Sequence, residues 1–292
     1  TVVLWYASHA KLLFAILVVT AIALEQARRY WERGGAADPD ETGSALTSLT
    51  SGAVFLVVKS IIGKLAVTTL ALVVYERYRL FTLDVMSPLV WIGVFVVRDF
   101  VYYWVHRAEH RVRVLWASHM VHHSPETIGF TTAVRVPWME AVYKPWLGLW
   151  VPLIGFHPVA FVALDIVAAA IGQLYHTDRV RRLPVLDRLF VTPSAHRVHH
   201  GSNPEYIDKN FGAVFIVWDR LFGTFQPELD AEPVRYGLVH PLPQAGYWRT
   251  LLALWFREWK LMARDVWHAR RWSHRFAYLF GPPGWAPKTA PQ

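Results

Sequence analysis

The sequence predicts an all-α fold, an integral membrane bundle of about four transmembrane helices carrying a cytosolic, histidine-rich helical cap. Three observations predict it. Long apolar blocks alternate with polar stretches, period-two strand patterns are scarce, and the clustered histidines fall in or beside the polar stretches 106–137 and 176–240. Apolar blocks of this length are typical of membrane helices rather than of a soluble core.

The composition supports a membrane protein and excludes several other classes. Of the 292 residues, 54% are hydrophobic, above the ~45–50% of an average soluble domain. The 15 Trp and 12 Tyr favour membrane–water boundaries, because one end of each ring is apolar and the other wet. A net charge of +8 in so apolar a chain suits an anionic membrane surface better than nucleic acid. The absence of cysteine excludes disulfides, thiolate nucleophiles, iron–sulfur clusters and cysteine-bound zinc.

The first two apolar blocks predict the N-terminal membrane helices. Residues 4–24 would span about 31 Å as a helix, close to the thickness of a hydrocarbon core. No small-residue cleavage site follows this run, which favours a retained helix over a signal peptide. We expect a polar loop at residues 25–45. The second block, 46–75, carries Lys59 and Lys64 near its middle, so either it is broken or those lysines face protein.

Two further blocks complete the predicted bundle. Ser87 followed by Pro88 favours a helix start, with a capping side chain and then proline at the first helical position. That helix continues to residue 105. Residues 138–175 predict a hairpin of two helices, each of about 17–18 residues, joined by a turn at Gly155. Residues 213–218 are the only short β candidate.

We expect one membrane domain over residues 1–292. Its parts are N-terminal transmembrane helices (1–105), a metal-binding cap in two segments (106–137 and 176–240), a transmembrane hairpin (138–175) and basic interfacial C-terminal helices (241–292). The C-terminal part has eight Lys or Arg against two Asp or Glu and is rich in Trp, as interfacial helices are. Three arginines in the 25–45 loop predict that this loop, and with it the histidine-rich cap, is cytoplasmic.

Eight of the 14 histidines form three tight groups, one HxxxH and two HxxHH. The groups are His106 and His110; His119, His122 and His123; and His196, His199 and His200. Residues three and four apart share one face of a helix, so each group is expected to point its imidazoles in one direction. Burying them without a metal would leave polar atoms unsatisfied. Eight or nine imidazoles exceed the about four to six ligands of one ion, so the pattern predicts two metal ions.

The type of ligand favours iron and O2 chemistry. A structural zinc site would favour cysteines or a closed set of four ligands. In a dry membrane pocket the expected substrates are hydrocarbon chains, whose strong C–H bonds resist acid–base attack. Breaking such a bond requires O2 that a metal has activated, and two irons can share the electrons that O2 demands.

With these motifs in place, the sequence resembles the fatty acid hydroxylase (sterol desaturase) superfamily over residues 99–241, about half of the chain. The similarity is strongest to its alkylglycerol monooxygenase-like branch. Together the matching segments are highly specific to the superfamily and less specific to any one substrate. They are YYWVHR (102–107), LWASHMVHHS (115–124), QLYHT (173–177), TPSAHRVHHG (192–201) and WDRLFGTF (218–225).

The resemblance implies a core of four transmembrane helices and a cytosolic, histidine-lined cap around two irons. It also implies that His176, at the end of the hairpin, is a ninth metal ligand. One departure concerns the substrate. Alkylglycerol monooxygenases have a glutamate after the HxxxH motif, whereas Arg111 follows His110 here and Glu109 lies inside the motif. This departure affects the ether-lipid assignment and leaves the metal ligands unchanged.

Asp99, Glu109 and Asn210 are the candidate catalytic residues around the metals. Asp99 lies two helical turns before His106 and could accept a hydrogen bond from a ligand imidazole, or could pair with other groups at the membrane interface. Asn210 belongs to a segment, IDKNFG (207–212), similar to a family segment near the metals, although a purely loop-forming role is also open. Asp219 and Arg220 are interpreted as structural. The histidines outside the groups are interpreted as non-ligands: His9, His157, His240, His268 and His274.

The predicted function is hydroxylation of a lipid C–H bond with O2, the substrate being an ether lipid, a fatty acyl chain or a sterol-like lipid. A desaturase of the same superfamily is the alternative, because both reactions begin with the same hydrogen abstraction. The chain shows no haem, flavin or nicotinamide motif, so the reductant is external. By resemblance the donor is tetrahydrobiopterin or a carrier of the cytochrome b5 or ferredoxin type.

Two more distant functions also fit part of the pattern. Residues 106–110 match H-x-x-E-H, with Glu109 as the base of a zinc peptidase, but both HxxHH groups then stay unexplained. A membrane metal-storage or transport protein would place its ligands near mid-membrane, whereas these clusters flank the apolar blocks. The composition favours a bacterial inner membrane, or the endoplasmic reticulum in a eukaryote, with lipid as partner and no nucleic acid.

Overall fold

The computed structural model describes residues 2–36, 38–62, 67–242 and 247–287, and within them the elements are helices with no β-strand. The all-α prediction is confirmed. In chain order the elements are α1 (Val2–Glu32), α2 (Pro39–Ile62), α3 (Thr68–Tyr78), α4 (Pro88–Arg111), α5 (Arg113–His119), α6 (Phe130–Ala133), α7 (Glu140–Leu147), α8 (Trp150–Ile154), α9 (Pro158–Tyr175), a 3-10 helix (Leu186–Arg188), α10 (Pro193–His199), α11 (Val217–Leu221), α12 (Tyr247–His268) and α13 (Trp272–Phe280).

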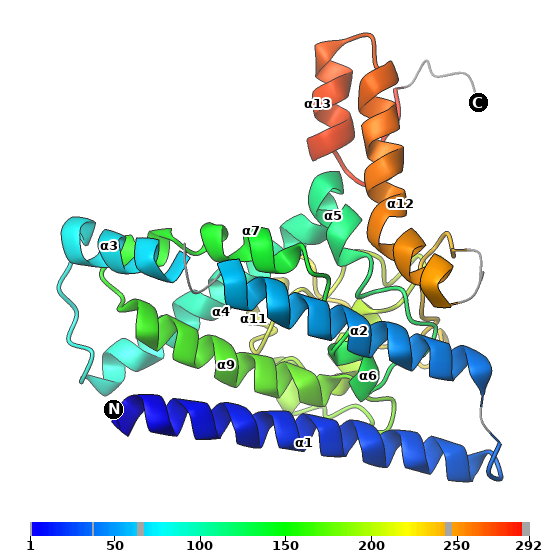
Figure 1. Ribbon diagram of the computed structural model, residues 1–292, viewed down its shortest axis with the longest axis horizontal. Coiled ribbons are helices and arrows are strands. Elements are labelled where there is room, and N and C mark those ends of the chain that lie inside the picture. The colour runs from blue at the N-terminus through cyan, green and yellow to red at the C-terminus, as the bar shows by residue number, and fades with distance from the viewer. Residues whose placement is uncertain (1, 37, 63–66, 243–246, 288–292) are drawn as a thin grey trace.

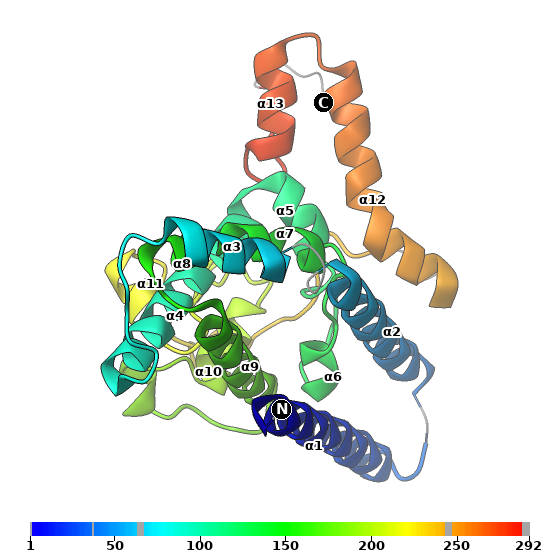
Figure 2. The ribbon, with the colours of Figure 1, turned by 60° about the vertical axis from the view of Figure 1, so that its left-hand side comes forward.

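The long helices form a bundle, and the short helices are spread over it: α5 contacts α4, α10 contacts α9, and α3 contacts α8. Figure 1 shows α1, α2 and α9 running alongside one another across the molecule. Helix α4 packs on α9, and α10 packs near the C-terminal end of α9. Helices α12 and α13 form a hairpin that projects from the body and stands crosswise to the bundle in both views (Figures 1 and 2). The fold therefore has a bundle, short helices packed on it and a protruding C-terminal arm.

Three helices of the described chain are long and apolar enough to cross a membrane, namely α2, α4 and α9. Only 17% to 28% of their most apolar windows is buried inside the protein, so most of these side chains face outward. Apolar surface of this extent requires a lipid environment. The chain is thus an integral membrane protein. The predicted first span, residues 4–24, lies within α1, and the side chains of residues 4–12 lie outside the described part.

Helix α4 begins at the predicted proline and is fixed to α9 by an ion pair. Pro88 takes the first helical position, but the predicted side-chain cap was wrong, because the extended Ser87 makes no side-chain hydrogen bond to the helix. Further along α4, the buried Arg98 side chain pairs with Asp165 of α9 at 2.8 Å. Charges within apolar spans persist where they are paired. This pair holds together the two spans whose C-terminal ends carry predicted metal ligands.

The predicted hairpin at 138–175 has unequal arms. Its second arm is the single helix α9, but the first is divided into α7 and α8, with Gly148 at the C-cap of α7. The turn is confirmed at Gly155, which has a φ of +125°. A Cβ atom at this position would lie 2.1 Å from the carbonyl oxygen of Phe81. Only glycine combines this backbone conformation with so close an approach.

The polar connection between the first two helices is shorter than predicted. Residues 25–32 are not part of a loop, because they extend α1 to Glu32. Arg29 on this extension pairs with Glu25 one turn earlier at 3.2 Å and with Glu41 of α2 at 2.6 Å. These half-buried ion pairs let polar residues continue both helices. The loop prediction was wrong because side-chain pairing outweighed polarity.

Two further expectations concern block 46–75 and the β candidate. The described part of block 46–75 forms α2 up to Ile62 and α3 from Thr68, and residues 63–66 between them lie outside the described part. Lys59 is exposed, with its ammonium 5.5 Å from the ring centre of Phe55, and Lys64 lies outside the described residues. The β candidate at 213–218 was wrong, because it contains only an isolated bridge from Phe215 to Phe190 and then enters α11.

Replacing Gly155 by alanine should destabilise the bundle. The left-handed backbone and the overlap with the Phe81 carbonyl together should cost about 1–3 kcal/mol or more. Thermal unfolding in detergent, followed by circular dichroism, measures the loss. Gly172→Ala is the matched control, because Gly172 lies within α9 with open space around its Cβ position, and there alanine should leave stability unchanged or raise it. Equal melting temperatures for both variants would contradict the turn assignment.

Candidate metal centre

Nine histidines from two separate parts of the chain meet at the cap end of the bundle. They are His106 and His110 in the last turns of α4, His119 at the end of α5 with His122 and His123 in the turn after it, His176 at the C-cap of α9, and His196, His199 and His200 at the end of α10. All are buried except His122, which is half-buried. The structure therefore brings together every histidine that the sequence predicted as a metal ligand.

The local sequence explains why α10 presents its histidines inward. Thr192 is extended, its hydroxyl accepts a hydrogen bond from the Ala195 N–H, and Pro193 begins the helix. All seven residues of α10 are buried. The basic residue among them, Arg197, reaches out to Glu228 at 2.6 Å. The short helix α10 is thus fixed by its cap, its burial and this ion pair, so its imidazoles face the interior of the protein.

The nine imidazoles divide into two adjacent groups, and each HxxHH motif contributes to both. In each group one ring nitrogen per residue lies within 4.8 Å of the others. The five-histidine group contains His106, His110, His119, His123 and His199, and the four-histidine group contains His122, His176, His196 and His200. The expectation that each motif points in one direction was wrong for the two HxxHH motifs, although His106 and His110 of the HxxxH motif do lie in the same group. The first and last histidines of a motif stay together, whereas the middle one turns to the other group.

The tautomers of four imidazoles follow from their backbone partners. His106 Nδ1 lies 2.9 Å from the Phe211 carbonyl oxygen, and His176 Nδ1 lies 2.9 Å from that of Gly172. His199 Nδ1 lies 3.0 Å from the Lys209 carbonyl, and His122 Nδ1 lies 3.4 Å from the carbonyl of Arg135. A carbonyl only accepts, so Nδ1 carries the proton in each ring. The Nε2 lone pairs are left free to face inward.

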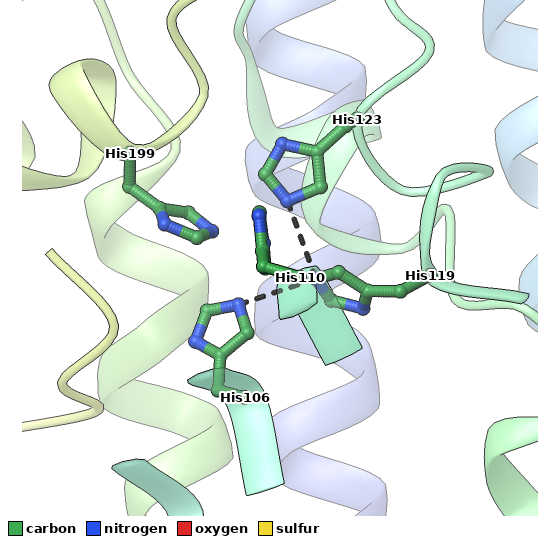
Figure 3. Close-up of side chains that lie close together, drawn as sticks. All are labelled: His106, His110, His119, His123 and His199. Carbon is green, nitrogen blue, oxygen red and sulfur yellow. Dashed lines mark hydrogen bonds between the residues drawn. The ribbon is translucent and has the colours of Figure 1, made fainter. Parts of the chain in front are cut away.

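The inward nitrogens are placed as ligands of a cation would be. Figure 3 shows the five rings of the larger group arranged around a common space. His119 Nε2 lies 3.2 Å from the Nε2 atoms of both His106 and His123. In that group the buried Nε2 atoms of His110 and His199 have no hydrogen-bond partner. Lone pairs that face one another and buried nitrogens without partners are both costly, and a metal ion between them would satisfy them.

Electrostatics keeps the imidazoles neutral, which is the form that binds a metal. Burial lowers the pKa of His176 and of His199 to about 4. Burial, followed by the nearby imidazoles, lowers the pKa of His123 and His200 well below the ordinary value. Neutral imidazole is a good ligand for iron, zinc and copper. The residues present therefore fit a pair of metal ions.

A buried carboxylate behind His119 was missed by the sequence reasoning. Glu140, the first residue of α7, accepts a hydrogen bond from His119 Nδ1 at 2.8 Å. Lys144, one turn later, lies 2.5 Å from the other oxygen of Glu140. Burial alone would lower the pKa of Lys144, but the carboxylates of Glu109 and Glu140 raise it above its ordinary value. The i, i+4 spacing of Glu140 and Lys144 was the available signal, hidden in a block interpreted as purely transmembrane.

Glu109 belongs to the same charged network and is fully enclosed. One of its carboxylate oxygens accepts a hydrogen bond from the hydroxyl of Tyr143 and lies 3.1 Å from the Lys144 ammonium. The other lies 3.6 Å from His119 Nδ1 and has no hydrogen-bond partner. Both carboxyl groups therefore lie on the same side of His119 and share one lysine, Lys144.

Asp99 and Asp219 organise the loop that supports the centre. Asp99 accepts hydrogen bonds from the Val214 N–H at 2.9 Å and the Trp218 indole at 2.9 Å, not from the predicted imidazole of His106. Asp219 accepts from the Phe211 N–H at 2.7 Å. The Phe211 carbonyl in turn binds His106. The physical reason for the difference is that the loop supplies unpaired backbone N–H groups, which a buried carboxylate satisfies well.

Asn210 also has a loop-holding geometry. It is buried, has a φ of +56°, and its amide donates to the carbonyls of Ala195 and Gln226 at 3.0 and 2.7 Å. Its side-chain oxygen accepts from the Gln226 N–H at 2.9 Å. Asn210 therefore ties α10 to the following loop next to His196. This matches the loop-forming role considered for it from the sequence.

A buried arginine stands behind His122. The guanidinium of Arg135 donates to the hydroxyls of Ser48, Ser124 and Ser44 at 3.0, 2.8 and 2.6 Å. Burial lowers the pKa of Arg135 to about 10. Through its carbonyl contact with His122, this residue connects α2 to the four-histidine group.

The other histidines with described side chains lie outside both groups. His157 caps α9 by accepting from the Val159 N–H at 3.2 Å, and the exposed His268 bonds the carbonyl of Arg264 at 2.8 Å. His240 is exposed and His274 contacts Trp285. The remaining one, His9, lies outside the described side chains.

Known proteins are similar in sequence to this chain. The fatty acid hydroxylase family model matches residues 91–224. Alkylglycerol monooxygenase of Homo sapiens is 35% identical over 254 residues, which cover 85% of this chain and 54% of that protein. The Xenopus tropicalis alkylglycerol monooxygenase is 33% identical over 283 residues, or 97% of this chain and 60% of that protein. Ornithine lipid hydroxylase OlsE of Rhizobium tropici is 33% identical over 132 residues, covering 44% of this chain and 40% of that protein.

The chain spans about half the length of these curated relatives, and no solved structure matches it. The family match is nevertheless centred on the candidate metal centre, because residues 91–224 contain all nine converging histidines. Since this match coincides with similarity to alkylglycerol monooxygenases over most of the chain, the protein belongs to the fatty acid hydroxylase family.

Proposed function

We propose that this protein is a membrane monooxygenase that hydroxylates a lipid C–H bond with O2 at a pair of irons held by the nine histidines. The observation that carries the proposal is the convergence of nine neutral imidazoles into two adjacent groups, with unpartnered nitrogens directed inward. When bound, the irons would supply the activation of O2 that an unactivated C–H bond requires. The protein would supply orientation, a dry site and access from the bilayer.

The ligand set supports two unequal metal positions. The five-histidine group has Glu140 behind His119, and carbonyl acceptors fix two of its other rings. In the four-histidine group, carbonyls fix His122 and His176, and no carboxylate is hydrogen-bonded to its four imidazoles among the described contacts. Partners of this kind hold a ligand ring in place and tune the charge on the metal. We therefore propose that the five-histidine group donates more electron density to its metal ion than the four-histidine group does.

The proposed substrate is a lipid whose polar part bears an ether, ester or amide link, and an ether lipid is the first choice. Support comes from the similarity to alkylglycerol monooxygenases and to an ornithine lipid hydroxylase. The replacement of a glutamate by Arg111 distinguishes this chain from the ether-lipid branch, and Arg111 pairs with Asp208 at 3.1 Å. Desaturation is the alternative outcome, since the abstraction of the first hydrogen is common to both reactions.

The environment of Glu109 argues against the zinc peptidase. A peptidase base must reach a metal-bound water, whereas the Glu109 carboxylate is engaged by Tyr143 and Lys144. The position of the histidines argues against a transporter. They lie at the C-terminal ends of α4 and α9 rather than midway along these spans.

The reductant and the sidedness are part of the same proposal. With no cysteine in the chain, electrons would come from a reduced pterin such as tetrahydrobiopterin or from a carrier of the cytochrome b5 or ferredoxin type. We place the centre on the cytoplasmic side, because the arginines Arg28, Arg29 and Arg33 lie near the end of α1, beside the cap.

Iron analysis of the reconstituted protein tests the two-group arrangement. Wild type should bind a pair of irons per chain. His110→Ala should weaken the five-histidine group, and His196→Ala should weaken the four-histidine group, each leaving about one iron, because each removes one ligand from only one group. Elemental analysis after Fe(II) loading gives the ratio. His268→Ala, an exposed histidine outside both groups, is the control and should retain both irons. Unchanged iron content in both ligand variants would refute the assignment.

Lipid mass spectrometry tests the reaction. Cells carrying the intact gene should contain a lipid that is heavier by one oxygen, or a cleavage product of it, which is absent with His122→Ala. A loss of two hydrogens would instead identify a desaturase. Both products should require O2, because neither reaction proceeds by hydrolysis. Peptide cleavage or metal flux without any oxidised lipid would sink the oxygenase proposal.

Variants of Glu140 test how His119 is positioned. Glu140→Ala removes the acceptor for the His119 Nδ1–H and should weaken metal binding in the five-histidine group by about 10- to 100-fold. Glu140→Gln keeps an acceptor and should lose much less affinity. Competition with a chromogenic chelator measures both. Glu205→Ala, an exposed cap glutamate, is the control. If Ala and Gln weaken binding equally, or if the four-histidine group is the one affected, Glu140 does not act through His119.

A further inference from the structure

Helix α13 carries a stripe of aromatic side chains that the protein itself does not cover. Trp272, Phe276 and Phe280 follow one another at intervals of four residues and therefore share one face. Their exposed fractions are 80%, 64% and 49%. Phe276 contacts Phe280 with ring centres 4.7 Å apart, and Trp272 lies one turn before Phe276. An exposed aromatic stripe of this kind marks a contact surface.

The charge of the arm formed by α12 and α13 is one-sided. Between Tyr247 and Phe280 the sequence has seven Lys or Arg and two Asp or Glu. The two acids, Glu258 and Asp265, are turned inward and bind the buried Arg113 of α5 at 2.8 and 2.9 Å. Their negative charges are therefore paired with Arg113 of α5. The outer surface of the arm is left basic.

The basic residues lie beside the aromatic stripe. Arg270, Arg271 and Arg275 occupy the turn between the helices and the first turns of α13, and the first two are exposed. The Arg275 guanidinium lies 4.8 Å from the ring centre of Trp272. Aromatic rings flanked by arginines are the composition of helices that lie in the interface of a bilayer.

The direction of the arm fits a membrane surface. Helices α2, α4 and α9 are the spans, and the arm stands crosswise to the bundle in both views (Figures 1 and 2). An element perpendicular to spanning helices lies along the plane of the bilayer. The arm packs on α5, which directly follows the end of α4, so this contact is level with the end of a span.

The attachment is firm enough to hold this direction. Arg113 bonds both acids of α12 through its side chain, and its backbone N–H donates to the Gly281 carbonyl after α13 at 3.0 Å. Its guanidinium also lies 5.9 Å from the ring centre of Tyr278. One buried residue therefore contacts α12, α13 and the segment after them, and fixes the arm as a unit.

We propose that the α12–α13 arm lies on the membrane surface on the cap side, with Trp272, Phe276 and Phe280 in the interface and the arginines bound to anionic lipid headgroups. The bilayer is favoured over a second copy of the chain because the exposed arm is uniformly basic, so two copies would repel each other there. It is also continuous with the lipid that surrounds the spans. Anionic headgroups supply the charge that the arm lacks.

A single fluorescent label tests the proposal on the full chain. Because the chain has no cysteine, Trp272→Cys or Phe276→Cys can be labelled uniquely with the environment-sensitive dye NBD. The protein is reconstituted, one copy per nanodisc, in phosphatidylcholine alone or with equal parts of phosphatidylglycerol. In the anionic discs the emission should shift to shorter wavelength and iodide quenching should fall severalfold. Val185→Cys, 78% exposed on the cap, is the control and should stay aqueous in both.

Removing the charge separates the two parts of the proposal. In the background Arg270→Gln, Arg271→Gln and Arg275→Gln, the difference between the two lipid compositions should be lost. A label that stays aqueous in both discs overturns the proposal. Insertion that is equal in both discs and unaffected by the three substitutions overturns the role of anionic headgroups. A label buried only when two copies share a disc assigns the stripe to self-association instead.

Discussion

The constraint on which the centre depends is the desolvation of nine imidazoles in one small volume. Burial removes water from their nitrogens and lowers their pKa values, so the rings remain neutral and their lone pairs are available. The same burial leaves nitrogens of His110 and His199 without partners. Such an arrangement is costly to hold empty and favourable to hold around cations. Many of the buried polar contacts in the fold hold these rings in place.

These contacts are made by buried charged side chains and backbone carbonyls around the rings. Asp99 and Asp219 satisfy the N–H groups of the loop whose carbonyl at Phe211 orients His106. On the opposite side, Glu140 orients His119, and Lys144 neutralises it. Asp99, Asp219 and Glu140 therefore each have a defined partner, and none of these three carboxylates is required to act as a free base. This explains how a chain with spans of low polarity can retain so many ionisable groups near their ends.

The surface of the membrane determines the level at which the candidate metal centre lies. The spans end where the histidines begin, so a lipid chain in the bilayer and the candidate metal centre lie at adjoining levels of the molecule. The basic arm adds a third element at that level and is anchored through Arg113, which stands between the ligand-bearing ends of α4 and α5. The position of the centre and the position of the arm thus follow from one boundary, the surface of the bilayer.

The sequence by itself determined the helical class, the start of α4, the turn at Gly155 and eight of the nine histidines that meet, because apolar period, proline and glycine chemistry and motif spacing are local properties. The ninth, His176, was predicted only from the resemblance to the hydroxylase superfamily. Tertiary structure alone decided how the histidines divide into the five-histidine and four-histidine groups. The geometry of a helix turn fixes which residues are neighbours, but it does not fix which group each imidazole faces. Tertiary structure also decided the partners of Asp99 and the contact between Glu140 and His119, which join residues 115 and 21 positions apart. Such contacts arise only when distant segments pack, and no local pattern encodes them.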